Sequence, residues 1–177
     1  MMNLNDLKYP IGKFVMPKSL AMYEIKEGIE ALASFPEKLK ALVKSITAEQ
    51  ENWVYRPDGW SIKQVIHHCA DSHMQSVTRF RWALTESTPT IKTYHEALWA
   101  QMSDYRGPIQ PSLEIISGLH ARWVYLLNSM KPHDFEKTFV HPHHDREMRL
   151  DENLALYAWH SEHHLAHISQ ALKSKGS

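Results

Sequence analysis

The chain has 177 residues, a length typical of one domain, and we treat residues 1–177 as a single unit. Hydrophobic residues make up 43% and charged residues 23%, as in ordinary globular proteins. Lys plus Arg and Asp plus Glu number 20 each, so the composition gives no broad basic surface for nucleic acid. No stretch approaches the ~20 apolar residues of a membrane span, and the N-terminus lacks the features of a signal peptide. These observations predict a cytoplasmic protein with neither nucleic acid nor membrane as partner.

Cysteine and histidine are used very differently. The one cysteine, Cys69, excludes an internal disulfide and falls in register with Ile62, Val65 and Ile66, which predicts a core position rather than a nucleophile. Histidine occurs 13 times, with eight of these residues between positions 133 and 167. Because neutral imidazole is the commonest metal ligand, this surplus is a first indication of a metal site.

The N-terminal part predicts an extended segment and then a long helix. Residues 1–17 contain Pro10, Gly12 and Pro17, which favour an extended conformation. Apolar residues at helical spacing predict a helix over about 19–46, which Pro36 would kink or split. Residues 47–50 have the form of a capping box and predict a short turn.

The rest of the chain predicts further helices and one hairpin. A second capping box at residues 61–64 opens a long helix to about residue 87, and helical segments follow at about 94–103 and 112–130. Residues 137–140 and 147–150 predict a small β-hairpin, and Asp151 can cap a last helix that runs to about residue 173. The predicted fold is an all-α four-helix bundle with a small hairpin before the last helix. Its long connections argue against simple up-down order.

The last helix carries two histidine pairs at i, i+4 spacing: His160 with His164, and His163 with His167. Residues four apart lie on one helix face, so the two imidazoles of a pair can reach the same ion. On a helical wheel, His160 and His164 flank the apolar stripe, whereas His163 lies nearly opposite it. Because a metal site needs partial burial, the first pair is favoured.

The third ligand should come from another helix, and His67–His68 is the obvious source. His68 lies slightly nearer the apolar stripe, while His67 lies near the cationic Lys63. His73 is nearer the stripe centre and is predicted to be a hydrogen-bonded core residue. The set His68, His160 and His164 would hold one divalent ion. The alternative is that such spacing arises by chance in a histidine-rich chain without a metal. A zincin is excluded, since Ser161 replaces the glutamate of HExxH.

Several segments together resemble the DinB superfamily, and most closely its YfiT-like branch. The segments are Trp60–His73, which resembles the signature helix; His160–His164, which resembles the second metal-binding segment; and Tyr9–Gly12, His120 with Arg122–Trp123, and His141–Pro142. The resemblance implies a four-helix bundle whose three-histidine site falls on His68, His160 and His164. It also implies nickel or zinc, a homodimer, and a metal-dependent hydrolase. Members of the wider group transfer low-molecular-weight thiols such as bacillithiol. Cys69 departs from the pattern, in which relatives carry leucine.

Three classes of function stay open on the sequence alone. Three protein ligands leave open positions on the ion, which suits hydrolysis by an activated water or transfer of a metal-bound thiolate to an electrophile, with a small molecule as substrate. A non-catalytic scaffold would instead fill the fourth position from the protein. The candidates for a general base are Asp71, Glu162, His163, His141, His143 and His144, and His141 and Glu162 are the two we name as catalytic. Arg122 and Trp123 are core residues or pocket wall, and packing is favoured for Trp123.

Overall fold

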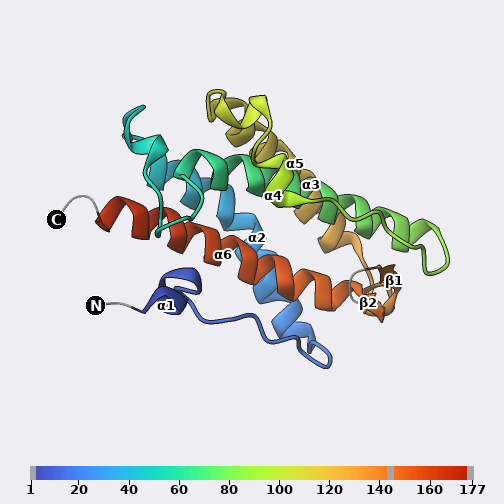
Figure 1. Cartoon of the computed structure of the whole chain (residues 1–177). Helices are drawn as coiled ribbons and strands as arrows, with labels where there is room; N and C mark the ends of the chain where they lie inside the picture. The colour runs from blue at the N-terminus through green and yellow to red at the C-terminus, as the bar shows by residue number, and fades with distance from the viewer. Residues whose placement is uncertain (1–2, 143–145, 175–177) are drawn as a thin grey trace.

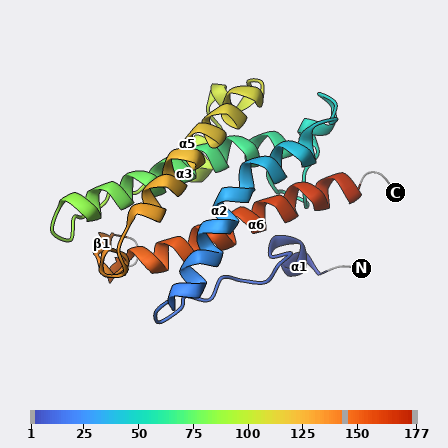
Figure 2. The same cartoon turned by 180° about the vertical axis from the view of Figure 1, so that it is seen from behind.

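A computed structural model describes residues 3–142 and 146–174. Four long helices form a bundle: α2 (Met22–Val43), α3 (Ile62–Thr85), α5 (Gln110–Ser129) and α6 (Leu150–Ser174) (Figure 1 and Figure 2). The N-terminal segment holds the short helix α1 (Leu4–Lys8). The connections hold the short helix α4 (Glu96–Trp99) and the 3₁₀ turns Gln50–Asn52, Ser103–Arg106 and Pro132–Glu136. The predicted four-helix bundle is confirmed. Among the described residues, no helix combines the length and apolar character needed to cross a bilayer.

The helix order around the bundle is not the order along the chain. α2 packs mainly against α5 and α6, and α3 packs mainly against the same two helices. Consecutive helices α2 and α3 therefore occupy opposite corners, as do α5 and α6. This arrangement needs long crossings between helices, and it confirms that the bundle is not a simple up-down bundle.

Local sequence signals place the helix starts and the hairpin. Ser61 and Gln64 form a capping box at the start of α3. The backbone N–H of Gln64 donates to Ser61 Oγ at 3.2 Å, and the backbone N–H of Ser61 donates to Gln64 Oε1 at 3.0 Å. The strands β1 (Thr138–His141) and β2 (Arg146–Arg149) pair antiparallel, each one residue from its predicted bounds. Phe139 faces Met148 across the pair and both are buried, so the hairpin closes one end of the core.

Four local predictions need correction. Part of the predicted extended N-terminus forms α1, and the helix predicted at 94–103 is confined to Glu96–Trp99. α2 continues unbroken through Pro36, which is buried within it, so packing outweighs the lost hydrogen bond and the helix is not split. α6 begins at Leu150, so Asp151 lies inside its first turn. There the Asp151 carboxylate pairs with Arg149 and accepts from the Leu20 amide.

A polar layer divides the hydrophobic core in two. One cluster contains Leu32, Val77, Trp123 and Leu154, and the other contains Phe35, Cys69, Ile116 and Leu165. On each long helix the chain passes from one cluster to the other. The side chains between them include His73 on α3, His120 on α5 and His160 and Ser161 on α6, all but His160 fully buried. The predictions that Cys69 and Trp123 pack in the core are confirmed.

Candidate metal centre

Three histidines from two helices meet at one point. His160 and His164 project from successive turns of α6, and His68 comes from α3. His160 Nε2 lies 3.1 Å from His68 Nε2 and 3.1 Å from His164 Nε2. One potential ligand atom from each residue lies within 4.8 Å of the other two. The structure thus brings together the three predicted ligands, so that one cation could contact all three.

The three imidazoles are held in the form that binds metals. Burial lowers the pKa of His68 from its ordinary value to about 4, helped by the neighbouring His167. Burial, with the adjacent histidines, also keeps the pKa values of His160 and His164 well below the ordinary range. All three rings are therefore neutral near pH 7 and can offer lone pairs. A set of neutral imidazole nitrogens fits zinc, nickel or a similar divalent ion.

The second ring nitrogen of His160 begins a buried chain of hydrogen bonds. Its Nδ1 lies 3.1 Å from His73 Nε2, and His73 Nδ1 lies 2.7 Å from His120 Nε2. His120 Nδ1 is 2.7 Å from the backbone carbonyl oxygen of Leu32 on α2. The prediction that His73 is a hydrogen-bonded core residue is confirmed. We call His160, His73, His120 and the Leu32 carbonyl the core relay.

His164 begins a second chain, which leads towards the N-terminus. His164 Nδ1 lies 3.3 Å from His167 Nδ1, and His167 Nε2 lies 3.1 Å from the carbonyl oxygen of Lys8. The Tyr55 ring stacks on His167, with centroids 3.8 Å apart. We call His164, His167 and the Lys8 carbonyl the terminal relay. The role of His167 was not anticipated, because its partner lies 159 residues away in the chain.

His68 is held differently from the other two. Its Nδ1 is buried and has no hydrogen-bond partner among the described residues. The Trp60 ring packs against its imidazole at a centroid distance of 4.7 Å. His67, the alternative from the same helix, faces away from the cluster, and its Nδ1 lies 2.7 Å from Ser112 Oγ. The position of His68 is therefore fixed by packing and by the neighbouring rings.

A cavity of about 620 Å³ opens beside the three histidines. Its wall contains His68, His160 and His164 themselves. Apart from Ala97, the other lining residues are aromatic or charged, or are further histidines: Tyr9, Tyr55, Trp60, Tyr94, Lys8, Arg56, Asp58, Glu96, His163 and His167. Both signs of charge are present, so a small molecule carrying an ammonium group and a carboxylate would find complementary side chains.

The N-terminal segment completes this cavity. α1 runs beside α6 in both views of the bundle (Figure 1 and Figure 2). Tyr9, the residue after α1, packs near His163, which the helical wheel placed opposite the core but which is buried in the structure. The Trp159 ring stacks on the His163 ring with centroids 4.3 Å apart, and the Tyr9 ring centroid lies 6.1 Å from that of His163. Burial lowers the pKa of His163 to about 3, so its ring is neutral in the cavity wall.

The other predicted general bases lie away from the cavity lining. Asp71 accepts a hydrogen bond of 2.6 Å from the Tyr105 hydroxyl in a separate hollow. Glu162 forms a partly exposed ion pair with Lys38 at 2.6 Å. His141 is half-buried at the end of β1 and does not line the cavity. His143 and His144 lie outside the described residues.

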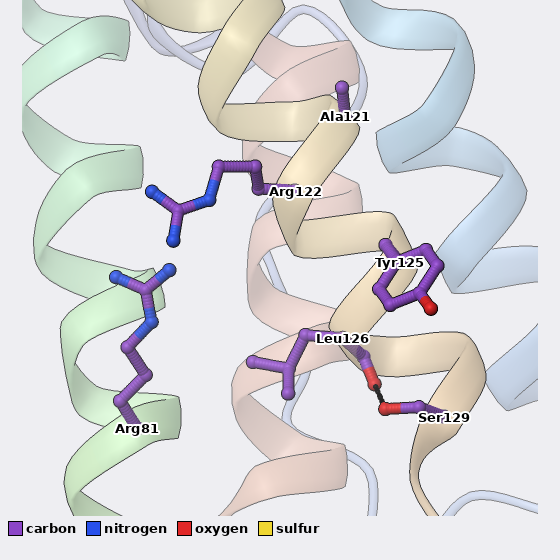
Figure 3. Close-up of a pocket in the computed structure, with 6 residues that line it drawn as sticks. All are labelled: Arg81, Ala121, Arg122, Tyr125, Leu126 and Ser129. Carbon is purple, nitrogen blue, oxygen red and sulfur yellow. Dashed lines mark hydrogen bonds between the residues drawn. The ribbon is translucent and has the colours of Figure 1, made fainter.

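A second groove, between α3 and α5, has a different chemistry (Figure 3). Arg81 on α3 and Arg122 on α5 point toward each other across it, and Tyr125, Leu126 and Ser129 of α5 also line it. Among the described residues its lining contains no imidazole, thiol or carboxylate, so these residues offer no donor set for a divalent cation. Arg122 is therefore a pocket-wall residue, as one alternative proposed, but of a groove other than the histidine cavity.

Comparison with known proteins agrees with this geometry. The sequence profile of the DinB superfamily matches residues 31–168. The chain belongs to the DinB superfamily and to its YfiT-like family. A protein of Bacillus cereus and one of Bacillus thuringiensis subsp. konkukian, each named a "putative metal-dependent hydrolase", are 43% identical to it over 170 residues. Each alignment covers 96% of this chain and 98% of the relative.

A YfiT-like fold is also evident in three dimensions. The solved structure of YfiT from Bacillus subtilis superposes with a TM-score of 0.94 at 38% sequence identity, covering 97% of this chain and 98% of that one. The YfiT protein of that solved structure is described as a "probable metal-dependent hydrolase with an unusual four-helix bundle topology". The non-sequential helix order found above is consistent with that description.

Proposed function

We propose that the protein is a metal-dependent hydrolase that holds one divalent ion on His68, His160 and His164. The observation that carries this proposal is the meeting of three neutral imidazole nitrogens in the wall of a 620 Å³ cavity. The names of the relatives support the same activity. Zinc and nickel are the ions we propose, because both bind imidazole nitrogen readily.

The side chains that line the cavity have different roles in the proposed reaction. When bound, a divalent ion on three histidines supplies Lewis-acid chemistry and lowers the pKa of a water or thiol at its open positions. His163 is neutral and lines the cavity, so its imidazole can form a hydrogen bond with a water or substrate there, but its pKa near 3 makes it a weak base. Burial raises the pKa of the Tyr94 phenol, which therefore keeps its proton and can donate a hydrogen bond to a substrate oxygen. Trp60 and Tyr55 give the substrate apolar walls.

A second candidate function is transfer of a low-molecular-weight thiol to an electrophile. The charge pattern of the cavity favours it, since Lys8 and Arg56 can bind carboxylates while Asp58 and Glu96 can bind an ammonium group. An amino-acid-derived thiol carries both groups. The hydrolase and the transferase use the same three histidines and differ in what occupies the open position.

A purely structural metal site is the weakest candidate. Such a site usually has four protein ligands, and among residues 3–142 and 146–174 the cluster contains three. The three-ligand set opens onto a cavity large enough for a small molecule, which favours catalysis.

Activity on one metal-loaded preparation separates these functions. Ester and amide substrates would be tested beside a thiol mixed with an electrophilic acceptor, for wild type and for His160→Ala. Hydrolysis that requires His160 supports the main proposal, and thiol conjugation that requires His160 supports the second. Equal rates in wild type and variant would contradict both. His133→Ala, a change at an exposed histidine outside the cavity, is the matched control.

A further inference from the structure

Two backbone carbonyls, those of Leu32 and Lys8, lie at the far ends of the two histidine relays. We propose that these carbonyls fix the ring tautomers of His160 and His164, so that Nε2 of each ring presents a bare lone pair to the ion. His73, His120 and His167 are then positioning residues. Pro36 contributes because it has no N–H to bind the Leu32 carbonyl within α2. This inference rests on the proposed metal site but makes a separate claim about the ring protons.

The core relay ends on a carbonyl that its own helix cannot use. In a regular helix the Leu32 oxygen would accept from the amide of residue 36, four positions later. Residue 36 is proline, which has no N–H. The Leu32 oxygen is therefore available, and His120 Nδ1 approaches it at 2.7 Å. This gives a reason for a buried proline inside a 22-residue helix that continues past it.

The direction of each hydrogen bond then follows from this oxygen. A carbonyl can only accept, so His120 must carry its proton on Nδ1, and its Nε2 is left as an acceptor. His73 must donate to it from Nδ1, which leaves His73 Nε2 as an acceptor for His160. His160 therefore carries its proton on Nδ1. Its Nε2, which faces His68 and His164, has no proton.

Each ring nitrogen of His73 and His120 has one hydrogen-bond partner, so a single proton on each ring satisfies all of these contacts. Burial lowers the pKa of His120 to about 4, which keeps this ring neutral near pH 7. Both rings lie in the layer between the two hydrophobic clusters, where Phe35 packs against each at about 5 Å. Each ring is therefore neutral and has one donor and one acceptor.

The terminal relay follows the same rule. Lys8 is the last residue of α1, so its carbonyl has no amide of that helix to bind. His167 must donate to it from Nε2, and its Nδ1 then accepts from His164 Nδ1. His164 thus carries its proton on Nδ1 and, like His160, leaves Nε2 bare. Two independent chains of contacts reach the same tautomer at both α6 ligands.

The ring protons can be observed directly by NMR. Long-range proton–nitrogen spectra of the metal-free protein distinguish protonated from bare ring nitrogens. We expect Nδ1–H and bare Nε2 for His160, His164, His73 and His120, and Nε2–H for His167. An Nε2 proton on His160 or His164 would overturn the proposal. Because no metal is present, this result does not depend on whether the proposed function is correct.

Zinc affinity gives the second readout, with two substitutions at one position. His120→Gln retains a donor and an acceptor, whereas His120→Leu has neither. We expect His120→Leu to weaken zinc binding about 10–100-fold, the usual effect of removing an outer-shell partner, and His120→Gln to stay within about threefold of wild type. Equal affinities for the two variants would overturn the role of His120.

Pro36→Ala keeps every histidine and covers the case in which His120→Leu fails to fold. It restores an amide that competes for the Leu32 oxygen and has the better helix propensity. We expect an unchanged or higher melting temperature, a shifted His120 Nδ1–H resonance and several-fold weaker zinc binding. An unchanged resonance with wild-type affinity would overturn the role of Pro36. Wild-type protein with the expected tautomers but no zinc binding would instead contradict the proposed function alone.

Discussion

The core relay and the terminal relay each fix the tautomer of one ligand histidine, but the core relay is packed more tightly by the rest of the protein. The core relay crosses from α6 through α3 and α5 to α2, and its members lie between the two hydrophobic clusters. The terminal relay ends on α1, a five-residue helix with no buried residue, and is braced by Tyr55. The same ligand geometry can therefore be built into a core or depend on a docked segment. The first is as stable as the fold, and the second can be lost locally.

The largest effect should follow from breaking the core relay at His73. His73→Leu removes two hydrogen bonds and leaves His160 Nδ1 and His120 Nε2 without their partner. Because unsatisfied buried polar groups cost about 1–3 kcal/mol each, we expect the free energy of unfolding to fall by about 2–5 kcal/mol. Chemical denaturation of the metal-free protein measures this. A decrease in the free energy of unfolding of less than about 0.5 kcal/mol would show that the core relay contributes little to stability.

Acid should destabilise the metal-free protein over a defined range. Burial lowers the pKa of His120 from its ordinary value of 6.5 to about 4. As the pH falls, His120 is therefore protonated in the unfolded chain before it is protonated in the folded protein. Stability from His120 is complete above about pH 6.5 and is lost progressively down to about pH 4, for about 3 kcal/mol in all. His167, with a pKa also near 4, adds to the same loss. Denaturant midpoints at pH 7 and pH 5 test this, and a higher midpoint at pH 5 would contradict it.

Breaking the terminal relay should separate metal binding from stability. His167→Ala leaves His164 Nδ1 without its acceptor and removes the contact to the Lys8 carbonyl of α1, but it leaves the core relay intact. We expect zinc binding to weaken about tenfold, while the free energy of unfolding falls by less than His73→Leu costs. Calorimetric titration with zinc gives the affinity. A larger stability loss for His167→Ala than for His73→Leu would reverse the comparison between the relays.

The smallest effect should come from Glu162, a predicted catalytic residue. Its carboxylate pairs with Lys38 on the surface, and both side chains are more than 40% exposed. Exposed ion pairs contribute little to protein stability, so Glu162→Gln should change the free energy of unfolding by no more than about 1 kcal/mol. Turnover on any substrate found should stay within about twofold of wild type. A loss of two orders of magnitude would place Glu162 in the reaction after all.

Much of the fold was predictable because its signals are local. The capping box Ser61–Gln64 marks the start of α3, and the spacing of His160 and His164 places two imidazoles on one face of α6. Both depend on residues within one turn of each other. The wheel also placed these two beside the core, and with His68 they form the observed cluster.

The rest of the site depends on contacts between distant parts of the chain. The wheel placed His163 opposite the core because it cannot represent the N-terminal segment that covers that face of α6. The relay acceptors are backbone carbonyls, which no side-chain pattern reveals. Pro36 was the one available signal, since a proline within a strong helical pattern frees the carbonyl four residues earlier.

Metal content of protein purified without a histidine tag tests the central claim most directly. After loading with zinc or nickel and removal of excess, elemental analysis should find one ion per chain in wild type and in the exposed-site control His133→Ala. It should find none above background in His160→Ala and His164→Ala. Equal metal in the ligand variants, or no metal in wild type after loading, would contradict the three-histidine site.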